Sequence, residues 1–317
     1  REYAYWYDQS GNNNDWTSNG GLTESDVMLD SPTNNFSVIN PLLNKAAGAV
    51  LSEGNLKFAH IASGLSNNLS TIGLSSGKWY YEHLWQSGTS AIHTGILGED
   101  SVNADFGSTA NGYGYYSNSG NKYTNATLSA YGASYTTGDI IGVQVNLDDG
   151  ELTFYKNGVS QGLAFTGLSG DYFLGGGDAS PSGSSTVMAN FGQDSSFAGN
   201  KTPQGNSDAN GIGDFYYAPP AGFLALCTQN LPDATVIPSE HFNTVLYTGN
   251  ASTNAITGVG FQPDFTWIKR RDTNYGHSIN DVVRTFGNRL DSSSTAAEAD
   301  HSSSFSSVDS DGFTLST

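Results

Sequence analysis

Short runs of alternating apolar and polar residues, separated by turn-forming residues roughly every eight to twelve positions, extend from Phe36 to about Phe197. Runs of this length and period are typical of β-strands, and their spacing is that of a β-sandwich. No apolar repeat of about 3.6 residues persists along the chain, so we expect an essentially all-β fold. The clearest predicted strands are Lys78–Trp85, Ile92–Leu97, Ile140–Leu147, Glu151–Tyr155 and Thr186–Phe191.

Tight hairpin turns are predicted at two places in this region. The run that ends at Leu147 is followed by Asp148-Asp149-Gly150, and the run that ends at Tyr155 is followed by Lys156-Asn157-Gly158. Asp-Gly and Asn-Gly readily adopt the positive φ angles that two-residue hairpin turns require. The pattern therefore predicts two successive β-hairpins.

The rest of the chain divides around this predicted sandwich at 36–199. Residues 1–35 are rich in Asn, Asp, Ser and Gly and predict an extended arm, held by aromatic side chains at Tyr3, Tyr5, Trp6, Tyr7 and Trp16. Residues 200–239 predict a linker or bridging segment, whose loop at 200–213 either joins two domains or caps the sandwich. Residues 240–317 are again β-rich but short for a complete sandwich of about 100 residues, so we expect a partial β domain.

Composition narrows the classes of function. Asp and Glu number 30 against 12 Lys and Arg, which gives a net charge of −18 and repels a phosphate backbone, so nucleic-acid binding is excluded. The longest apolar runs, such as Ala221–Cys227, fall far short of the ~20 residues that span a bilayer, so we expect no membrane insertion. A single cysteine and six histidines supply neither a disulfide nor a zinc cluster, and we expect no cofactor and no bound metal.

No catalytic residue is assigned, because the polar residues lack the spacing that catalysis requires. His60, His83 and His93 lie on or beside apolar strands, where a packed and hydrogen-bonded histidine is the favoured interpretation. His277, Asp281 and Arg284 can be drawn as an acid–base cluster, but no nucleophile motif accompanies them. We therefore expect the protein not to be an enzyme.

Acidic residues raise two further possibilities, calcium binding and glycoside hydrolysis. Asp148-Asp149-Gly150-Glu151 and Asp309-Ser310-Asp311-Gly312 carry oxygen ligands, but neither has the twelve-residue loop with a terminal Glu that marks a strong calcium site, and both favour turns. Hydrolysis of a glycoside needs two converging carboxylates. Nothing in the spacing brings together two of the available candidates, which are Glu82, Glu99, Asp100 and Asp105.

A tyrosine-rich stretch is the candidate binding surface. It lies among Gly, Ser and Asn residues, a composition that makes loop surfaces adaptable, and saccharides and protein partners both use such platforms. The alternative is that Tyr113, Tyr115 and Tyr131 are core residues of strands with their hydroxyl groups at the rim. The candidate ligand-binding residues are Tyr113, Tyr115, Tyr116, Tyr123, Tyr131 and Tyr135.

Several motifs in order resemble the SPRY domain. They are Gly77-Lys78-Trp79-Tyr80-Tyr81-Glu82, Thr94-Gly95-Ile96, Gly138-Asp139-Ile140-Ile141-Gly142-Val143, Leu152-Thr153-Phe154-Tyr155-Lys156-Asn157-Gly158 and Ala189-Asn190-Phe191-Gly192-Gln193. The resemblance implies an antiparallel sandwich of the SPRY/concanavalin-like type, which binds partners through loops at one end and has no catalytic apparatus.

The flanking segments resemble parts of tailed-phage virion proteins. Asp8–Trp16 is similar to the tail of a concanavalin-like domain, and Asp30–Phe36 is similar to the lead-in to a SPRY domain in such proteins. Gly260–Lys269 with Asp309–Phe313 resembles an uncharacterised phage β domain. That domain normally continues with a strand pair containing a Val-Ala-Trp-type motif, which is absent here, so we expect either a longer polypeptide or completion of the last domain by a neighbouring subunit.

Together these features predict a virion structural protein of a tailed bacteriophage, located on the particle as a fibre, spike, tail or capsid-surface component. Its expected partners are other copies of itself, neighbouring virion proteins and a host-surface glycan or protein. A secreted glycan-active enzyme and a bacterial cell-surface adhesin with the same sandwich remain alternatives. An enzyme would release reducing ends from a host polysaccharide, whereas a binding module would be retained on it unchanged.

Overall fold

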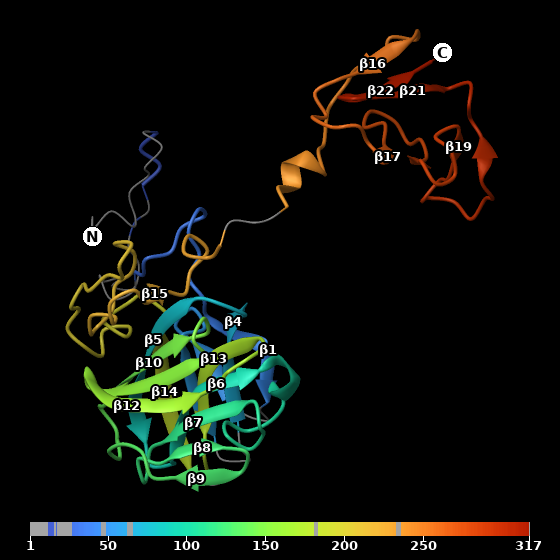
Figure 1. Ribbon diagram of the computed structural model, residues 1–317. Coiled ribbons are helices and arrows are strands. Elements are labelled where there is room, and N and C mark those ends of the chain that lie inside the picture. The colour runs from blue at the N-terminus through green and yellow to red at the C-terminus, as the bar shows by residue number, and fades with distance from the viewer. Residues whose placement is uncertain are drawn as a thin grey trace. The chain divides into compact units, whose positions relative to one another are not determined.

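The protein forms two compact units, residues 1–231 and 232–317, in a computed structural model that describes residues 12–15, 17, 27–45, 49–61, 66–180, 183–232 and 236–316. The first unit holds two large sheets that lie face to face (Figure 1). Most of the predicted arm, including its aromatic anchors, lies outside the described residues. Within the described ranges, no helix has the length and apolar character needed to cross a membrane.

One sheet of the first unit has seven antiparallel strands in the order β1-β4-β13-β6-β7-β8-β9. Its first three strands bring together segments far apart in the chain, because β13 returns between β4 and β6. In spatial order the strands are β1 (Ile39–Lys45), β4 (Ser66–Leu74), β13 (Tyr172–Asp178), β6 (Ile92–Gly98), β7 (Gly112–Tyr116), β8 (Lys122–Thr124) and β9 (Thr127–Ser129).

The second sheet has eight strands, with β5 at its centre between β10 and β14. Seven follow the antiparallel order β12-β11-β10-β5-β14-β3-β2, and the short β15 (Leu224–Ala225) adds in parallel to β5. The antiparallel strands are β12 (Val159–Thr166), β11 (Glu151–Lys156), β10 (Ile140–Asn146), β5 (Lys78–Gly88), β14 (Ser184–Asn190), β3 (Lys57–Ile61) and β2 (Ala49–Ser52).

The predicted all-β sandwich is confirmed, as are the predicted strands, which correspond to β5, β6, β10, β11 and β14. Both predicted hairpins form, because β10 pairs with β11 and β11 pairs with β12. Gly150 (φ 68°), Asn157 (φ 50°) and Gly158 (φ 78°) take the left-handed conformation that these turns require. The only helical segments within the described ranges are two single 3₁₀ turns, Glu99–Ser101 and Pro238–Glu240.

The main core fills the space between the two sheets and is rich in aromatic residues. Tyr81 on β5 illustrates how the layers are joined: its hydroxyl group lies 2.7 Å from the carbonyl oxygens of both Gly95 and Gly175 in the facing sheet. Its ring stacks on Phe191 with 5.5 Å between centroids. A buried phenol whose hydroxyl is satisfied in this way adds packing without an unpaired polar atom.

Residues 191–231 return over the outer face of the eight-stranded sheet and bury it. Tyr80, which points outward from β5, packs against Phe215 and Phe223 in this segment, and Leu84 packs against Phe197. Strand β5 is therefore buried on both faces. The predicted boundary at 199/200 differs from the structure, in which the first unit ends at Leu231 and the loop at 200–213 caps the sandwich.

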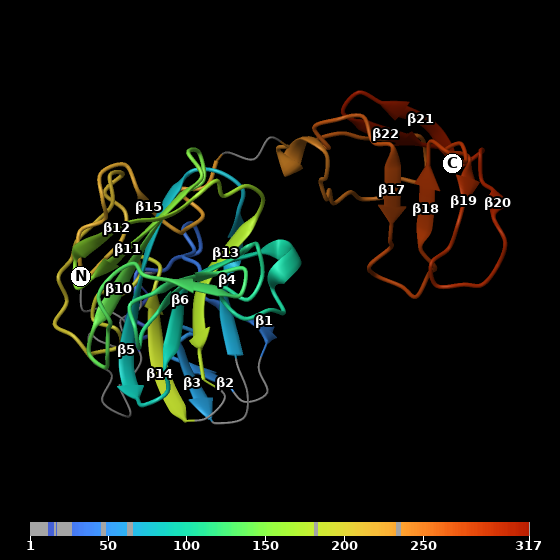
Figure 2. The same cartoon turned by 60° about the horizontal axis from the view of Figure 1, so that its bottom comes forward.

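The second unit has small sheets and a small core. It contains β16 (Asn254–Ile256), β22 (Gly312–Leu315) and β21 (Phe305–Asp309) in one sheet, and two hairpin-like pairs shown in Figure 2, β17 (Phe265–Ile268) with β18 (Ser278–Asp281) and β19 (Asn288–Arg289) with β20 (Ala299–Asp300). Among its described residues, the buried apolar ones are Ile256, Val259 and Phe313. Such a core is small for a unit of this length.

Candidate binding surfaces

The six candidate tyrosines do not share one surface. The four on β7 and β8 project from opposite faces of the seven-stranded sheet, and Tyr131 and Tyr135 lie in the loop between β9 and β10. Tyr115 and Tyr135 are buried in the core, and the Tyr135 hydroxyl donates to the Tyr115 carbonyl oxygen at 2.8 Å. Their assignment as ligand contacts is therefore wrong, since neither ring reaches solvent. Tyr113 also faces the core and packs on Phe165 with 5.0 Å between ring centroids.

Tyr131 is half-buried, and its hydroxyl group is already engaged. It donates to the carbonyl oxygen of Gly162 at 2.5 Å and accepts the backbone N–H of Phe154 at 3.1 Å. The pKa of Tyr131 is raised to about 12, mainly because burial disfavours the charged phenolate. Tyr131 thus attaches the 130–136 loop to the eight-stranded sheet. This agrees with the alternative that the sequence left open, in which its ring packs in the core and its hydroxyl group lies at the rim.

The remaining candidates, Tyr116 and Tyr123, lie on the outer face of the seven-stranded sheet. Both pack against His93, with ring centroids 5.0 Å from Tyr116 and 5.4 Å from Tyr123. All three are half-buried or buried, and together they form an aromatic surface on β6, β7 and β8. Ligand binding by Tyr116 and Tyr123 stays a prediction.

The sandwich histidines are buried, as the favoured interpretation expected. Desolvation lowers the pKa of His60 to about 4 and those of His83 and His93 to about 3. His60 bonds the hydroxyl group of Ser66, and His83 bonds that of Thr94 at 3.2 Å. These rings are neutral at pH 7 and serve packing.

Glu82 is the most unusual ionisable group in the sandwich, and its burial was not predicted. It points outward from β5 under the covering segment, where the backbone N–H groups of Tyr216 and Tyr217 donate to its carboxylate at 2.9 and 2.7 Å. The amide of Asn190 adds a third bond at 3.2 Å, and the hydroxyl of Tyr80 lies at 3.4 Å. Desolvation nevertheless raises the pKa of Glu82 to about 7.

The hydrogen bonds of Glu82 indicate a structural role, although its raised pKa is a feature that catalytic carboxylates share. No second carboxylate shares its hydrogen-bond partners, so the pair that glycoside hydrolysis needs is not assembled around it. Its carboxylate instead fastens residues 216–217 to the sheet. A sequence signal existed: Tyr80-Tyr81-Glu82-His83-Leu84 lacks the alternation of a half-exposed strand.

The other acidic candidates stabilise turns. Asp148 accepts the backbone N–H of Gly77 at 2.7 Å, and Asp311 accepts those of Gly258 and Gly260 at 2.9 and 2.6 Å. The last two bonds lower the pKa of Asp311. Within the described ranges, no group of three or more His, Cys, Asp or Glu side chains is arranged to hold a metal ion.

The three residues that could be drawn as an acid–base cluster in the second unit do not form one, because His277 lies apart from Asp281 and Arg284. His277 directly precedes β18 and Asp281 ends it, which puts them about 13 Å apart at ~3.3 Å per residue. His277 accepts the indole N–H of Trp267 at 2.7 Å, and Asp281 pairs with Arg284. Each polar group is thus committed to a different local contact.

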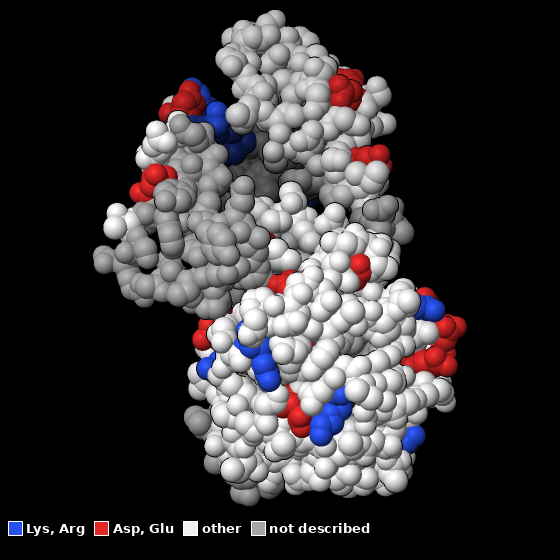
Figure 3. Space-filling view, turned by 90° about the vertical axis from the view of Figure 1, so that its left-hand side faces the viewer, with Lys and Arg blue, Asp and Glu red and all other residues white. Residues whose placement is uncertain are grey.

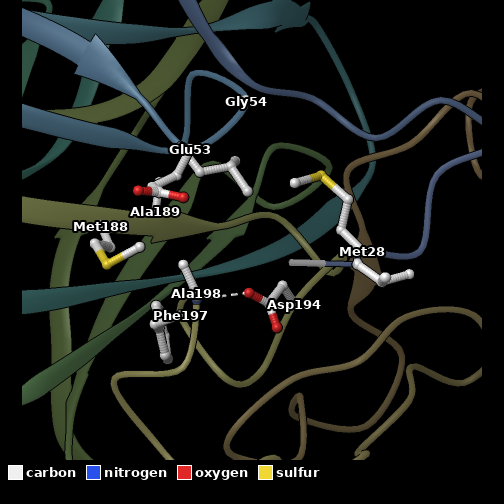
Figure 4. A pocket seen from close by; sticks show the side chains of 10 residues that line it. Met28, Glu53, Gly54, Met188, Ala189, Asp194, Phe197 and Ala198 are labelled. Atoms are coloured by element: carbon white, nitrogen blue, oxygen red, sulfur yellow. Dashed lines mark hydrogen bonds between the residues drawn. The ribbon is translucent and has the colours of Figure 1, made fainter. Parts of the chain in front are cut away.

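A pocket of about 120 Å³ opens beside β14 (Figure 4). Met28, Met188 and Phe197 supply apolar walls, and Glu53 and Asp194 supply carboxylates. The Asp194 carboxylate already accepts the backbone N–H groups of two residues in its own loop, at 2.9 and 2.7 Å. Its volume is well below the roughly 300 Å³ at which small-molecule sites begin, so the pocket suits water or a single small group.

Charge is thinly spread over the surface. On the face seen in Figure 3, charged side chains stand singly or in small groups among uncharged residues. One basic run occurs in the chain, Lys269-Arg270-Arg271, and it lies in the turn between β17 and β18. Beside it, Trp267 and Tyr275 are 60% and 64% exposed. Sequence analysis overlooked this turn, although three adjacent cations in so acidic a chain were a signal.

Two family models match the chain. One, the SPRY domain, covers residues 73–192, which include β5, β10, β11 and β14 of the sandwich. This stretch is therefore similar to the SPRY domain. The second model covers residues 237–317 and is described as a domain of unknown function, DUF7483.

Relatives of the SPRY domain occur in animals. Ran-binding protein 9 of Xenopus tropicalis is 42% identical over 82 residues, which are 26% of this chain and 15% of that protein. The same protein of Mus musculus is 40% identical over 82 residues and is covered to 12% of its length. The chain thus spans a small part of these relatives.

Solved SPRY domains resemble the chain over less than half of its length. The SPRY domain of human HERC1 covers 48% of this chain and 96% of its own, with a TM-score of 0.44 and 19% sequence identity. A human SPRY domain covers 44% and 93%, with a TM-score of 0.38 and 18% identity.

Proposed function

We propose that this protein is a binding and assembly component of a tailed-phage particle, in which the SPRY sandwich is a rigid interaction module and the second unit contacts neighbouring subunits. The phage assignment rests on the resemblance of the flanking segments to virion proteins. The SPRY match supports an interaction module. The animal relatives are matched over a small part of their length, so they indicate no particular partner for this chain.

One observation carries the assembly role: the second unit exposes more large apolar side chains than it buries. Among the residues of this unit that the structure describes, three are buried and ten are exposed. The exposed set is Val236, Ile237, Phe242, Leu246, Tyr247, Phe265, Trp267, Tyr275, Val282 and Val283. Exposed apolar side chains that share a patch mark interaction sites, and Phe265 and Trp267 share one face of β17.

The carboxylates support a role without catalysis. Glu82, Asp194 and Asp208 are buried, and each accepts backbone N–H groups that hold a loop in place. A catalytic carboxylate must be able to reach the reacting group, whereas these three carboxylates are occupied by hydrogen bonds to the backbone of the protein. An interaction module fits this use of charge better than a glycan-active enzyme does.

Imaging the native particle at side-chain resolution tests the proposal. The expected result is a symmetric multimer in which residues 240–317 contact other subunits. A host-polysaccharide assay provides the complement, in which the chain is retained and releases no reducing ends. A free monomer that releases reducing ends would overturn the proposal and favour the glycan-active enzyme.

A further inference from the structure

Strand β17 has one open edge. It pairs with β18 along its full length, and β18 is bridged in turn to Leu290 on its other side. The edge of β17 that faces away from β18 pairs with no strand among residues 236–316. Its outer main-chain groups are thus available to a further strand.

The exposed face of β17 is aromatic. Phe265 and Trp267 are 55% and 60% exposed, while Thr266 between them is buried, as the alternation of a strand requires. Folded proteins usually protect an edge strand with a charge, a proline or a bulge. None of these interrupts Phe265-Thr266-Trp267-Ile268, so this edge is built to be covered.

Opposite charges flank the strand. Asp264 precedes β17, and the basic run Lys269–Arg271 follows it. Lys269 bonds the carbonyl oxygen of Tyr275, and Arg270 pairs with Asp272 at 2.5 Å. The side chains of Asp264 and Arg271 make no hydrogen bond or ion pair with any residue that the structure describes.

We propose that β17 pairs antiparallel with β17 of a second copy of this chain about a twofold axis. Antiparallel pairing sets the start of each strand beside the end of the other, so each Asp264 stands opposite Ile268 of the other copy, one position before its basic run begins. A twofold axis satisfies both contacts at once, because the same surface is used twice. This pairing specifies how two copies would contact each other, and it rests on the assembly role proposed above.

The pairing also covers the aromatic face. With Thr266 on the axis, Phe265 of each copy stands directly opposite Trp267 of the other. Aromatic pairs across neighbouring strands stabilise sheets, and Trp and Arg are the residues that most often dominate interface energies. An acidic saccharide or a foreign strand would satisfy one flank of β17, whereas a second copy satisfies both.

Sedimentation of the full chain over a concentration series tests the pairing. We expect a dimer of the unmodified chain that Trp267→Lys and Asp264→Arg each weaken by roughly tenfold or more in dissociation constant. The double variant Asp264→Arg with Arg271→Asp restores the opposite flanks and should recover the dimer. Leu42→Lys is the control: Leu42 is 89% exposed on β1 of the first unit and belongs to no surface proposed here, so its change should leave the dimer intact.

The outcomes separate this inference from the proposed function. A multimer unaffected by Trp267→Lys and Asp264→Arg would overturn the β17 pairing and leave the assembly role standing. A chain that is monomeric at every concentration and in the particle would overturn both. A monomer whose tryptophan fluorescence is quenched by polygalacturonate but not by neutral dextran, with the quenching lost in Trp267→Lys, would replace the second copy with an acidic saccharide.

Discussion

Replacement of Glu82 by glutamine isolates the energetic effect of one buried carboxylate. Glutamine keeps the size of the side chain and one acceptor oxygen, but it cannot ionise. The carboxylate accepts the N–H groups of Tyr216 and Tyr217, so the variant loses one of these bonds and leaves an amide group facing a donor. Such a loss costs about 1–3 kcal/mol at any pH.

The effect that depends on pH has the opposite sign. Burial raises the pKa of Glu82 from its ordinary 4.5 to about 7. Below pH 4.5 the group is protonated in both the folded and the unfolded chain; between pH 4.5 and 7 the unfolded chain ionises first, which lowers the free energy of unfolding. The difference between the two pKa values corresponds to about 3 kcal/mol, lost as the pH rises through 7.

The buried histidines change the free energy of unfolding with pH in the opposite direction, so the comparison must remove their contribution. The unfolded chain protonates them near pH 6.5, while the folded chain resists down to about pH 4 for His60 and about pH 3 for His83 and His93. Their contribution to stability is therefore present above pH 6.5 and is lost as the pH falls. Both the unmodified chain and Glu82→Gln share this loss, so their difference reports Glu82 alone.

The assay is urea unfolding of both proteins at pH 5 and pH 8, followed by near-ultraviolet circular dichroism. We expect Glu82→Gln to gain about 2.5 kcal/mol relative to the unmodified chain on going from pH 5 to pH 8. Glu99→Gln, at an exposed carboxylate, is the control and should show a constant difference. A constant difference for Glu82→Gln as well would refute the raised pKa.

Three further predictions concern the sandwich. Gly176→Ala places a Cβ atom 2.2 Å from Cε1 of His83, so we expect a loss of about 1–3 kcal/mol in the free energy of unfolding, measured by urea; an unchanged midpoint would contradict the close approach. Asp208→Ala removes the acceptor of the Ala225 N–H at 2.9 Å, so hydrogen exchange at that amide should speed up at least tenfold, and unchanged protection would be evidence against the contact. Tyr116→Ala should weaken retention on host-surface extract without lowering the melting temperature by more than a few degrees; equal retention would remove Tyr116 from the candidate binding surface.

Local chemistry made the strands and turns of the sandwich predictable. Gly150 and Gly158 follow Asp149 and Asn157, and these pairs form tight turns through their own backbone preferences, with no help from distant residues. Strand positions were predictable for a similar reason, since alternation and β-branched or aromatic content are properties of neighbouring residues. The ordered motifs around Glu82 and Asn190 added the SPRY resemblance, which the family model bears out.

The face that each tyrosine occupies depended partly on the sequence and partly on the fold. Strand alternation alone puts Tyr115 and Tyr116 on opposite faces of β7, a signal present in the sequence. Which face is the interior follows only from the pairing of β6 with β13, a strand some eighty residues further along the chain. The sequence analysis therefore interpreted the tyrosine-rich stretch as one surface, although the fold divides its tyrosines between the core and the exterior.

For this protein, the order of residues along the chain was sufficient to predict an all-β sandwich and its two hairpins. Only the tertiary structure showed which segment covers the outer face of β5 and holds Glu82, and that Trp267 stays exposed beside an open strand edge. The physical reason is range: turns and strands depend on adjacent residues, whereas burial of a side chain depends on which distant segment returns to cover it.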